Sequence, residues 1–445
     1  ILDTWLDFRS RYGELPGFQV SIRKGGKLIF NKAYGLANVT KKTTYTPAHI
    51  GHVASNSKML TSCLLLTLHE QGVLSLQDKL VKHLPQLKKH KDKRFGAITL
   101  RDLVSHRSGI CRDGVDSSYW AHEKEFPSRE VFLREVMSTN LVYSPNTCSK
   151  YSNFGFGLLG LAIEAAGQDS YENLLQRHVI SKLSGCQIYP DYSSQPKGLF
   201  ADGHSHAVYQ GQRKPLKHIR THALAAASGA CANTESTTQF LHNFLFTDKL
   251  LTEATRKDLL HLVWQVQNVK DRPYGLGLQH STVGNNIYLG HNGTCPGFTS
   301  RTAALAGTEY VYGLIVNAND VSDYDFIRSM AELTQKLQNV FSPPELKKII
   351  VSQPFMNRWG AFMCVVGEHK ALTLSLDSWL LMADVTVLAR HKDGYFYADK
   401  LNGYGNVGEP KQFIQRHKTI VAVKNGANTI YPESVFLKKS AVSWL

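Results

Sequence analysis

The chain has 445 residues, of which 42% are hydrophobic and 20% are charged, an ordinary globular composition that excludes a fibrous or largely disordered protein. No stretch approaches the roughly 18 uninterrupted apolar residues of a membrane-spanning helix, so the sequence predicts a soluble chain. Its 51 Lys and Arg outnumber its 36 Asp and Glu, for a net charge of +15. The positive residues are scattered apart from 88–94, a segment without interleaved aromatics that indicates a solvated loop or, alternatively, an anion-binding patch. We expect no nucleic-acid partner.

The chain begins with the pattern of a β-hairpin followed by that of a core helix. Apolar and polar residues alternate in Phe18–Ile22 and Leu28–Phe30, on either side of Lys24–Lys27. Leucines then recur at every fourth position within Ser55–Gln71, and a glycine follows. This spacing predicts a buried helix over Ser55–Gln71.

A helical region comes next, and strand-like segments return after it. Between residues 78 and 262, loops rich in Gly, Ser and Asn join helix-like stretches at Val131–Ser138, Phe156–Ala166 and Glu235–Phe246. Alternation then predicts strands at Gly275–Gln279, Ser300–Ala304 and Tyr310–Asn317, and a closing helix at Phe326–Val340. Because strands lie on both sides of the helices, we expect an α/β fold: an antiparallel sheet flanked by helices, closed by both ends of the chain, with an inserted helical region.

Consecutive prolines, Pro343 and Pro344, end the closing helix because proline cannot continue it. The sequence therefore indicates a first domain over 1–341, a linker over 342–356 and a small antiparallel β domain, barrel-like or a sandwich, over 357–445. The strands expected in this last domain are Ala371–Leu376, Leu380–Ala389, Tyr395–Ala398, Lys411–Gln415 and Thr419–Val423.

The cysteine and histidine spacings favour neither a metal site nor a disulfide framework. The seven cysteines lie far apart and include no C-x-x-C. His204 and His206 with Asp202 could form a metal cluster, but no further ligand lies at a suitable spacing. We expect no metal and no cofactor. The chain begins at Ile1 rather than Met, which is compatible with removal of an export signal or another preceding segment, so the compartment stays open.

Ser55 and Lys58 lie three positions apart at the start of the predicted helix, which places their side chains on one face. A neighbouring ammonium favours the alkoxide, the helix N-terminus adds positive potential, and the Ser55 N–H can act as an oxyanion donor. Alone, this S-x-x-K pattern is weak evidence, because it occurs by chance in many chains and favours a helix-capping serine with a solvated lysine.

Two further triplets make the pattern specific. Tyr151-Ser152-Asn153 precedes the helix-like segment from Phe156, and His291-Asn292-Gly293 precedes a strand-like one. With S-x-x-K, Y-x-N and H-x-G in this order, the chain resembles the penicillin-recognising serine hydrolases, in the branch of class C β-lactamases, Tyr-type DD-peptidases and D-aminopeptidases. Segments such as Ile98–Ile110 also resemble the family, and the resemblance covers about residues 10–340. It implies a β-lactamase/transpeptidase-like sheet, and the C-terminal domain resembles the lipocalin-like barrel appended to some relatives.

The resemblance implies roles for four of these residues. Ser55 would be the acylated nucleophile and Lys58 its proton partner. Tyr151 would act as a phenolate-like base that relays a proton to the leaving group, since a nearby ammonium can lower the pKa of a phenol. Asn153 would hold Lys58 and the substrate amide.

The third triplet would serve the substrate. The N–H of Thr294 would be the second oxyanion donor, and Gly293 would leave room for the substrate to lie along the strand. His291 stands where relatives of the K-T-G type carry a lysine that anchors carboxylates, so we expect weaker anchoring of free carboxylates; the alternative is a structural histidine bonded to backbone.

These implications point to a metal-independent serine hydrolase that forms an acyl-enzyme and acts on peptides with D-amino acids. The alternatives are an esterase or weak β-lactamase, and a catalytically silent penicillin-binding protein. We expect small peptide or ester substrates, β-lactams as acylating ligands, and homo-oligomers formed through the C-terminal domain. The resemblance favours a periplasmic or secreted location over a cytoplasmic one.

Overall fold

The computed structural model describes residues 1–194, 199–207, 212–260, 273–357, 360–377, 385–398, 409–425 and 428–443. It divides into two compact units, one formed by Leu15–Tyr324 and the other by Ile1–Glu14 together with Asp325–Leu445. Among the described residues, none of the helices combines the length and apolar character needed to cross a bilayer.

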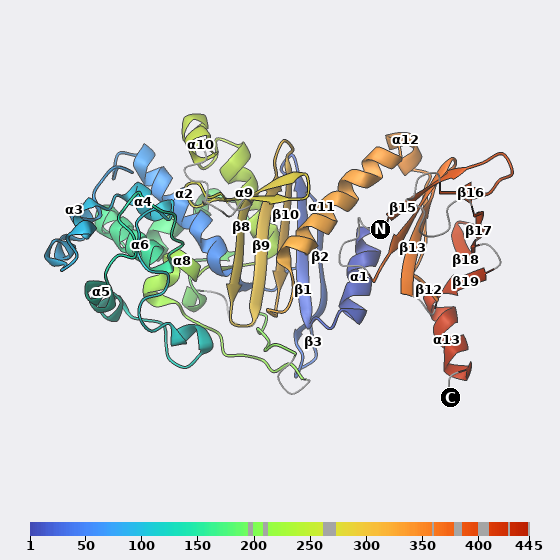
Figure 1. Ribbon diagram of the computed structural model, residues 1–445, viewed down its shortest axis with the longest axis horizontal. Helices are drawn as coiled ribbons and strands as arrows, with labels where there is room; N and C mark the ends of the chain where they lie inside the picture. The colour runs from blue at the N-terminus through green and yellow to red at the C-terminus, as the bar shows by residue number, and fades with distance from the viewer. Residues whose placement is uncertain are drawn as a thin grey trace. The chain divides into compact units, whose positions relative to one another are not determined.

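The first unit is built on a seven-stranded antiparallel sheet (Figure 1). Its strands, in spatial order, are β3 (Thr43–Thr44), β2 (Lys27–Asn38), β1 (Gly17–Lys24), β10 (Tyr310–Val316), β9 (Phe298–Leu305), β8 (Asn286–Cys295) and β7 (Gln279–Val283). β1 and β2 form the expected hairpin, and β1 pairs with β10 from Phe18 opposite Val316 to Lys24 opposite Tyr310. Segments from both ends of this unit therefore meet at the centre of the sheet, which confirms the predicted fold class of an antiparallel sheet flanked by helices.

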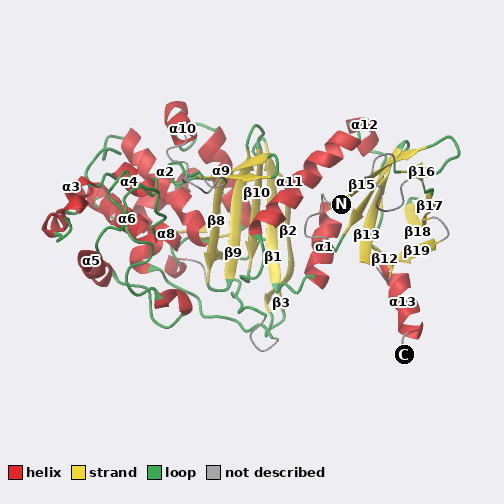
Figure 2. Ribbon diagram, viewed as in Figure 1, coloured by secondary structure: helices red, strands yellow, loops and turns green. Residues whose placement is uncertain are grey.

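Helices and short strands make up the sequence between β3 and β7. The helices are α2 (Ser57–Glu70), α3 (Leu80–His83), α4 (Leu100–Val104), α5 (Arg129–Ser138), α6 (Asn153–Gly167), α7 (Tyr171–His178), α8 (Ala225–Ser228), α9 (Thr234–Phe246) and α10 (Glu253–Leu260). Figure 2 shows α3, α4, α5, α6 and α8 together on the left of the sheet. A small sheet has the order β4 (Gly51–His52), β6 (Cys231–Ala232) and β5 (Ile188–Tyr189). α2 is buried along nearly its whole length and packs against α6, α7, α8 and β8. It is the core helix that the leucine spacing predicts.

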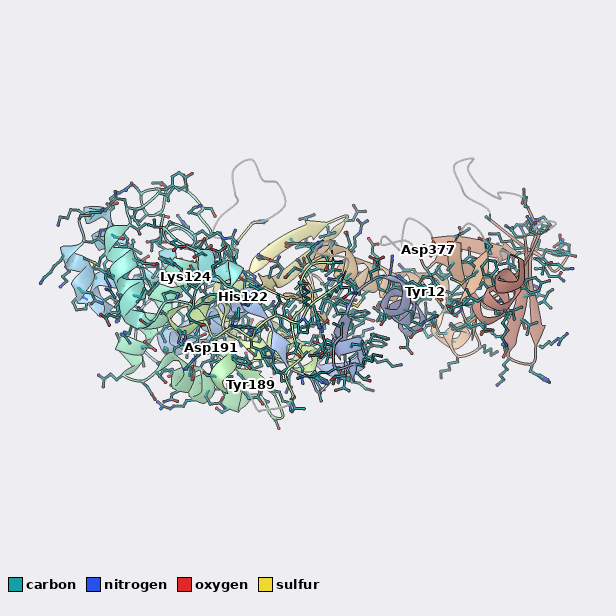
Figure 3. All side chains as sticks on the ribbon, turned by 90° about the horizontal axis from the view of Figure 1, so that it is seen from below. Tyr12, His122, Lys124, Tyr189, Asp191 and Asp377 are labelled. Atoms are coloured by element: carbon teal, nitrogen blue, oxygen red, sulfur yellow. The ribbon has the colours of Figure 1, made fainter. Side chains whose placement is uncertain are left out.

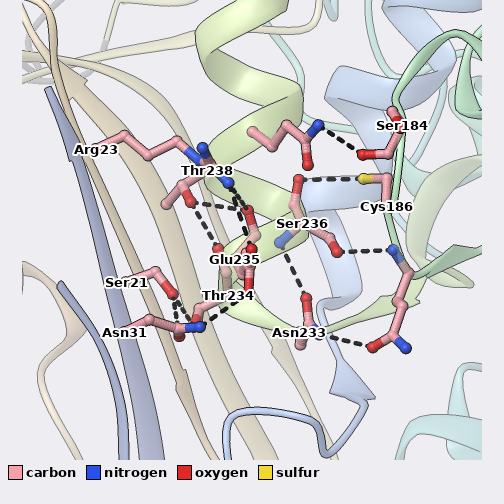
Figure 4. A network of polar contacts seen from close by, with 12 residues as sticks. Ser21, Arg23, Asn31, Ser184, Cys186, Asn233, Thr234, Glu235, Ser236 and Thr238 are labelled. Carbon is pink, nitrogen blue, oxygen red and sulfur yellow. Dashed lines mark hydrogen bonds and ion pairs between the residues drawn. The ribbon is translucent and has the colours of Figure 1, made fainter. Parts of the chain in front are cut away.

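The N-terminal end of α9 is bonded to the sheet by a polar network (Figure 4). Thr234 Oγ1 lies 2.7 Å from Ser21 Oγ of β1, and Glu235 accepts a 2.9 Å hydrogen bond from Asn31 Nδ2 of β2. Asn233 caps the helix by accepting from the Ser236 N–H at 2.9 Å. α9 therefore covers β1, β9 and β10 in a fixed register.

The second unit contains a closed antiparallel barrel. Its strands pair in a ring of β13 (Gly360–Val366), β12 (Phe355–Asn357), β19 (Asn428–Pro432), β18 (Thr419–Asn425), β17 (Lys411–Arg416), β16 (Phe396–Tyr397), β15 (Val385–Arg390) and β14 (Lys370–Ser375), and β14 pairs back with β13. One more strand, β11 (Ile350–Val351), pairs with β13. Within the described residues this is an eight-stranded barrel, as the strand pattern indicates; residues 380–384 of one predicted strand lie outside the described part.

Four helices accompany the barrel strands in this unit or lead into it: α1 (Leu2–Tyr12), α11 (Asp323–Val340), α12 (Pro343–Leu346) and α13 (Glu433–Ser443). α11 ends just before the two prolines, as expected, but the prolines then occupy the first turn of α12, where a missing N–H costs nothing. Ser342 and Glu345 form a capping box there. The segment 342–356 thus contains a short helix and two strand segments as well as connecting chain.

One predicted strand was placed too early. The sequence indicates a strand at Gly275–Gln279, whereas β7 occupies Gln279–Val283. Gly277 has φ of +75°, and a Cβ there would lie 2.5 Å from the Ser62 Cβ and 3.0 Å from the Lys58 carbonyl. The backbone turns tightly against α2 at this point. Residues 275–278 therefore do not form a strand, although apolar and small residues alternate there.

Candidate active site

Ser55 lies in a 3-10 turn, Ala54–Asn56, that leads directly into α2. Ala54 has φ of +46°, a strained backbone conformation for a residue with a side chain. The turn is bonded to the sheet: Asn56 Nδ2 donates to Ser300 Oγ at 2.9 Å, and Ser300 Oγ donates to the Val53 carbonyl at 2.8 Å. These bonds hold the strained turn and present Ser55 at the helix start.

Lys58 is fully buried one turn along α2 from Ser55. Its Nζ lies 3.1 Å from Ser55 Oγ, 2.7 Å from Asn153 Oδ1 and 2.9 Å from the Ala227 carbonyl of α8. Burial disfavours the ammonium and lowers the pKa of Lys58 well below its usual value. The neutral amine is the form that can accept a proton from a serine hydroxyl.

Tyr151 immediately precedes the N-cap residue of α6, Ser152, and its hydroxyl lies 2.9 Å from Ser55 Oγ. Lys58 Nζ is 4.8 Å from the centroid of its ring. Burial raises the pKa of Tyr151, and this effect outweighs the hydrogen bond with Ser55, which lowers it. The direction is opposite to the one expected from a neighbouring ammonium. Because burial favours a neutral Lys58 as well as a neutral phenol, Tyr151 is suited to donate a proton.

Asn153 connects the lysine to residues that the sequence motifs do not include. Its Oδ1 faces Lys58, while its Nδ2 donates to Asp113 Oδ1 at 2.6 Å. Asp113 also accepts from Trp120 Nε1 at 3.1 Å, and its other carboxylate oxygen lies 3.0 Å from Arg112 Nε. Asp113 therefore sets the orientation of the Asn153 amide, so that its oxygen points to Lys58.

His291 is buried, and both of its ring nitrogens have protein partners. Nδ1 faces the Asn292 carbonyl, and Nε2 lies 3.2 Å from the Tyr274 hydroxyl. Burial, followed by the charge of Lys58, lowers the pKa of His291 to about 3. A neutral imidazole held in this way is the structural histidine of the alternative interpretation, and it cannot anchor a carboxylate as a cation.

Gly293 lies on β8 beside the nucleophile turn. A Cβ at this position would be 2.1 Å from the Val53 carbonyl oxygen and 3.0 Å from the Ser55 nitrogen. A side chain at this position would therefore collide with the nucleophile turn. Thr294, the next residue, lies on the cavity wall together with Ser55.

A cavity of about 740 Å³ opens at Ser55, and His122, labelled in Figure 3, lies on its wall. Lys58, Tyr151, His291 and Gly293 are not among the described lining residues, although the side chains of Lys58 and Tyr151 contact Ser55 Oγ. The residues that line the cavity are Ser55, Arg112, Asp113, Trp120, Ala121, His122, Asn153, Ser205, His206, Leu216, Thr294, Cys295, Pro296 and Asn319.

Other residues that the motifs bring to attention have structural partners. Ser57 Oγ donates to the Ala54 carbonyl at 2.6 Å and accepts from the Ala230 N–H at 2.9 Å. His106 accepts from the Ser152 N–H at 3.2 Å, and its ring centroid lies 4.3 Å from that of Tyr151. Both side chains support the site from behind.

His204, which was considered as a metal ligand, makes hydrogen bonds to the backbone instead. His204 lies 3.1 Å from the Asn317 carbonyl through Nδ1 and accepts from the Val39 N–H at 3.2 Å through Nε2. Across the described ranges, His, Cys, Asp and Glu side chains form no group of three placed to hold a metal ion. Burial raises the pKa of Cys295 on the cavity wall, which disfavours a reactive thiolate.

A family model described as Beta-lactamase matches residues 7–334. The chain belongs to the β-lactamase family. This family of serine hydrolases is the one that the three motifs indicate, and the match spans the seven-stranded sheet and its helices.

Individual proteins are similar at lower identity. Protein flp of Staphylococcus aureus is 26% identical over 329 residues, which cover 73% of this chain and 63% of that protein. The chain thus matches less than two thirds of the length of this relative. The octameric penicillin-binding protein homologue from Pyrococcus abyssi superposes with a TM-score of 0.68 over 96% of this chain and 98% of that chain, at 19% identity. D-amino acid amidase from Ochrobactrum anthropi gives 0.64 over 76% and 99%, also at 19%. At this identity the two structures show a shared fold.

Proposed function

We propose that the chain is a serine hydrolase that forms an acyl-enzyme on Ser55 and cleaves amide bonds next to D-amino acids. The observation that carries this proposal is the convergence of an amine at 3.1 Å and a phenol at 2.9 Å on one serine hydroxyl at the cavity. The names of two fold neighbours, a D-amino acid amidase and a D-stereospecific amidohydrolase, support the choice of substrate class.

The mechanism follows from the protonation states that burial favours. The neutral Lys58 amine takes the proton of Ser55 as Oγ attacks the substrate carbonyl. The N–H groups of Ser55 and Thr294 are the candidate donors to the resulting oxyanion. Tyr151 gives its proton to the leaving amine as the C–N bond breaks, and Lys58 then returns the proton that it took from Ser55 to the phenolate of Tyr151. Water then attacks the ester, and the acid product and free serine are released.

The test combines a probe with a substrate panel. Intact-mass measurement after reaction with a fluorophosphonate, followed by peptide mapping, should give one adduct on Ser55 and none on Ser57 or Ser62. D-amino-acid anilides should then turn over faster than their L-enantiomers, p-nitrophenyl esters and nitrocefin. An adduct elsewhere would reject the nucleophile. Turnover of esters alone would indicate an esterase, and turnover of nitrocefin alone would indicate a β-lactamase. A stable adduct without any turnover would indicate a catalytically silent penicillin-binding protein.

The pH profile gives a prediction whose sign depends on two neighbouring charges. Activity requires neutral Lys58, so kcat/KM falls as pH drops through the pKa of Lys58. The carboxylate of Asp113 raises the pKa of Lys58, and the guanidinium of Arg112 lowers it. With a neutral substrate, we therefore expect Asp113→Asn to move the acid limb to lower pH and Arg112→Gln to move it to higher pH. If both variants moved the acid limb in the same direction, the limb would reflect the titration of a group other than Lys58.

Assembly through the barrel remains a prediction. The similar Pyrococcus abyssi protein is described as octameric. Light scattering on the full chain, compared with a chain that ends before the barrel strands, would test whether this unit carries contacts between copies.

A further inference from the structure

The substrate cavity contains one permanent positive charge among its described lining residues. His291 is neutral and lies behind the wall, and burial lowers the pKa of His122 as well. Lys58 is buried and bonded to three oxygen atoms. Arg112 remains, and a guanidinium keeps its charge at every pH that a protein tolerates.

Arg112 is held in place by the elements that build the site. Its carbonyl accepts hydrogen bonds from the N–H groups of Asn153, at 2.9 Å, and Phe154, at 3.1 Å, in the first turn of α6. Its side chain contacts Asp113 Oδ2 through Nε at 3.0 Å, and the guanidinium carbon lies 5.5 Å from the centroid of the Tyr151 ring. The guanidinium is thus positioned over the phenol that contacts the nucleophile.

The contact with Asp113 uses Nε and leaves both terminal nitrogens for a further acceptor. The side chain of Arg112 is 67% exposed, whereas that of Asp113 is 13% exposed, and its Oδ1 already accepts hydrogen bonds from both Asn153 and Trp120. Two terminal N–H groups in one plane match the two oxygens of a carboxylate. The arrangement therefore differs from a simple surface ion pair, in which the carboxylate would face the fork of the guanidinium.

We propose that Arg112 is the carboxylate anchor of this cavity, and that the preferred substrates carry a free carboxylate which its two terminal nitrogens bind. In relatives of the K-T-G type the lysine at the position of His291 carries this positive charge, whereas here Arg112, in the loop before α6, supplies it. The inference rests on the proposed function, because it names the chemistry of the substrate for the same nucleophile. It also replaces the expectation that free carboxylates are anchored weakly.

The experiment compares matched ligands in the Ser55→Ala background, which prevents turnover. Calorimetry gives Kd for acetyl-D-alanyl-D-alanine and its C-terminal amide, and for succinyl- and butyryl-D-alaninamide. Each pair differs by one carboxylate, at the leaving-group end in the first pair and at the acyl end in the second. We expect the carboxylate to bind about 10-fold more tightly than its neutral partner in at least one pair. The pair that shows the preference identifies the end that Arg112 binds.

Adding Arg112→Gln should reduce this ratio to about one, and Arg112→Lys should retain part of it, since the charge remains but the planar fork is lost. Arg129→Gln is the matched control, because Arg129 is also exposed and paired with a carboxylate, Glu164 at 2.7 Å, but does not line the cavity. It should leave the ratio unchanged. No carboxylate preference in either pair, or a preference that survives Arg112→Gln, would overturn the proposal. Fluorophosphonate labelling of the unmodified chain, which retains Ser55, tests the proposed function separately. The carboxylate proposal and the hydrolase proposal can therefore fail independently.

Discussion

Replacement of Lys58 by methionine should reduce the rate of Ser55 acylation by about 10²- to 10⁴-fold, the range for loss of a positioned general base. Methionine has nearly the length of the lysine stem and suits a fully buried position, but it has no group that can accept the serine proton. The loss should appear in kcat and in kcat/KM together, because the amine acts on the reacting hydroxyl rather than on substrate binding. Single-turnover labelling with a fluorophosphonate measures it directly.

Two controls separate chemistry from folding. Ser55→Ala sets the background at which no label is incorporated. Lys58→Met leaves Asn153 Oδ1 and the Ala227 carbonyl without their present donor, so some destabilisation is expected, and a denaturant midpoint for each variant measures it. Labelling of folded Lys58→Met protein at the rate of the unmodified chain would remove Lys58 from the mechanism.

Gly293→Ala is expected to disable the site although it adds one methyl group that contacts no substrate. The new Cβ would be 2.1 Å from the Val53 carbonyl oxygen and 3.0 Å from the Ser55 nitrogen, and both are backbone atoms that cannot rotate away. Either β8 or the nucleophile turn must move. A displacement of about 1 Å at a reacting group costs roughly 10²-fold in rate, and overpacking costs about 1–3 kcal/mol of stability.

Gly96→Ala is the matched substitution, because a Cβ at Gly96 meets nothing within 4 Å. Its acylation rate and thermal midpoint should equal those of the unmodified chain. Normal kcat/KM in Gly293→Ala would mean that the turn and the strand are not in the contact described here, and that Ser55 reaches its position in another way.

Residue periodicity predicted the parts of the fold that rest on local burial. The leucine spacing located α2, and alternation located β1, β9, β10 and most of the described barrel strands, because these segments present one face to a core. The strand near Gly277 was wrong because a close backbone approach to α2, which no residue pattern records, turns the chain there.

The site was predictable to the extent that motifs encode it. Ser55, Lys58, Tyr151 and Asn153 were selected from two short motifs, S-x-x-K and Y-x-N, and they do lie together. Arg112 was missed because its place on the cavity wall depends on contacts formed only after folding. Asp113, a further residue outside the motifs, bonds to Asn153 across 40 residues of sequence. The expected direction of the Tyr151 pKa was wrong because burial outweighs neighbouring charge, and burial is a property of the folded chain. The lowered pKa of His291 agrees with the expectation of a neutral imidazole.

The bond between Ser300 and the Val53 carbonyl has a consequence for the order in which this protein becomes active. It joins residues 247 positions apart, and it fastens the strained turn that carries Ser55. A chain emerging from the ribosome therefore carries its serine and lysine long before the strand that locks them has been synthesised. The turn that presents Ser55 can therefore be fastened only after β9 has been made, late in the synthesis of this unit.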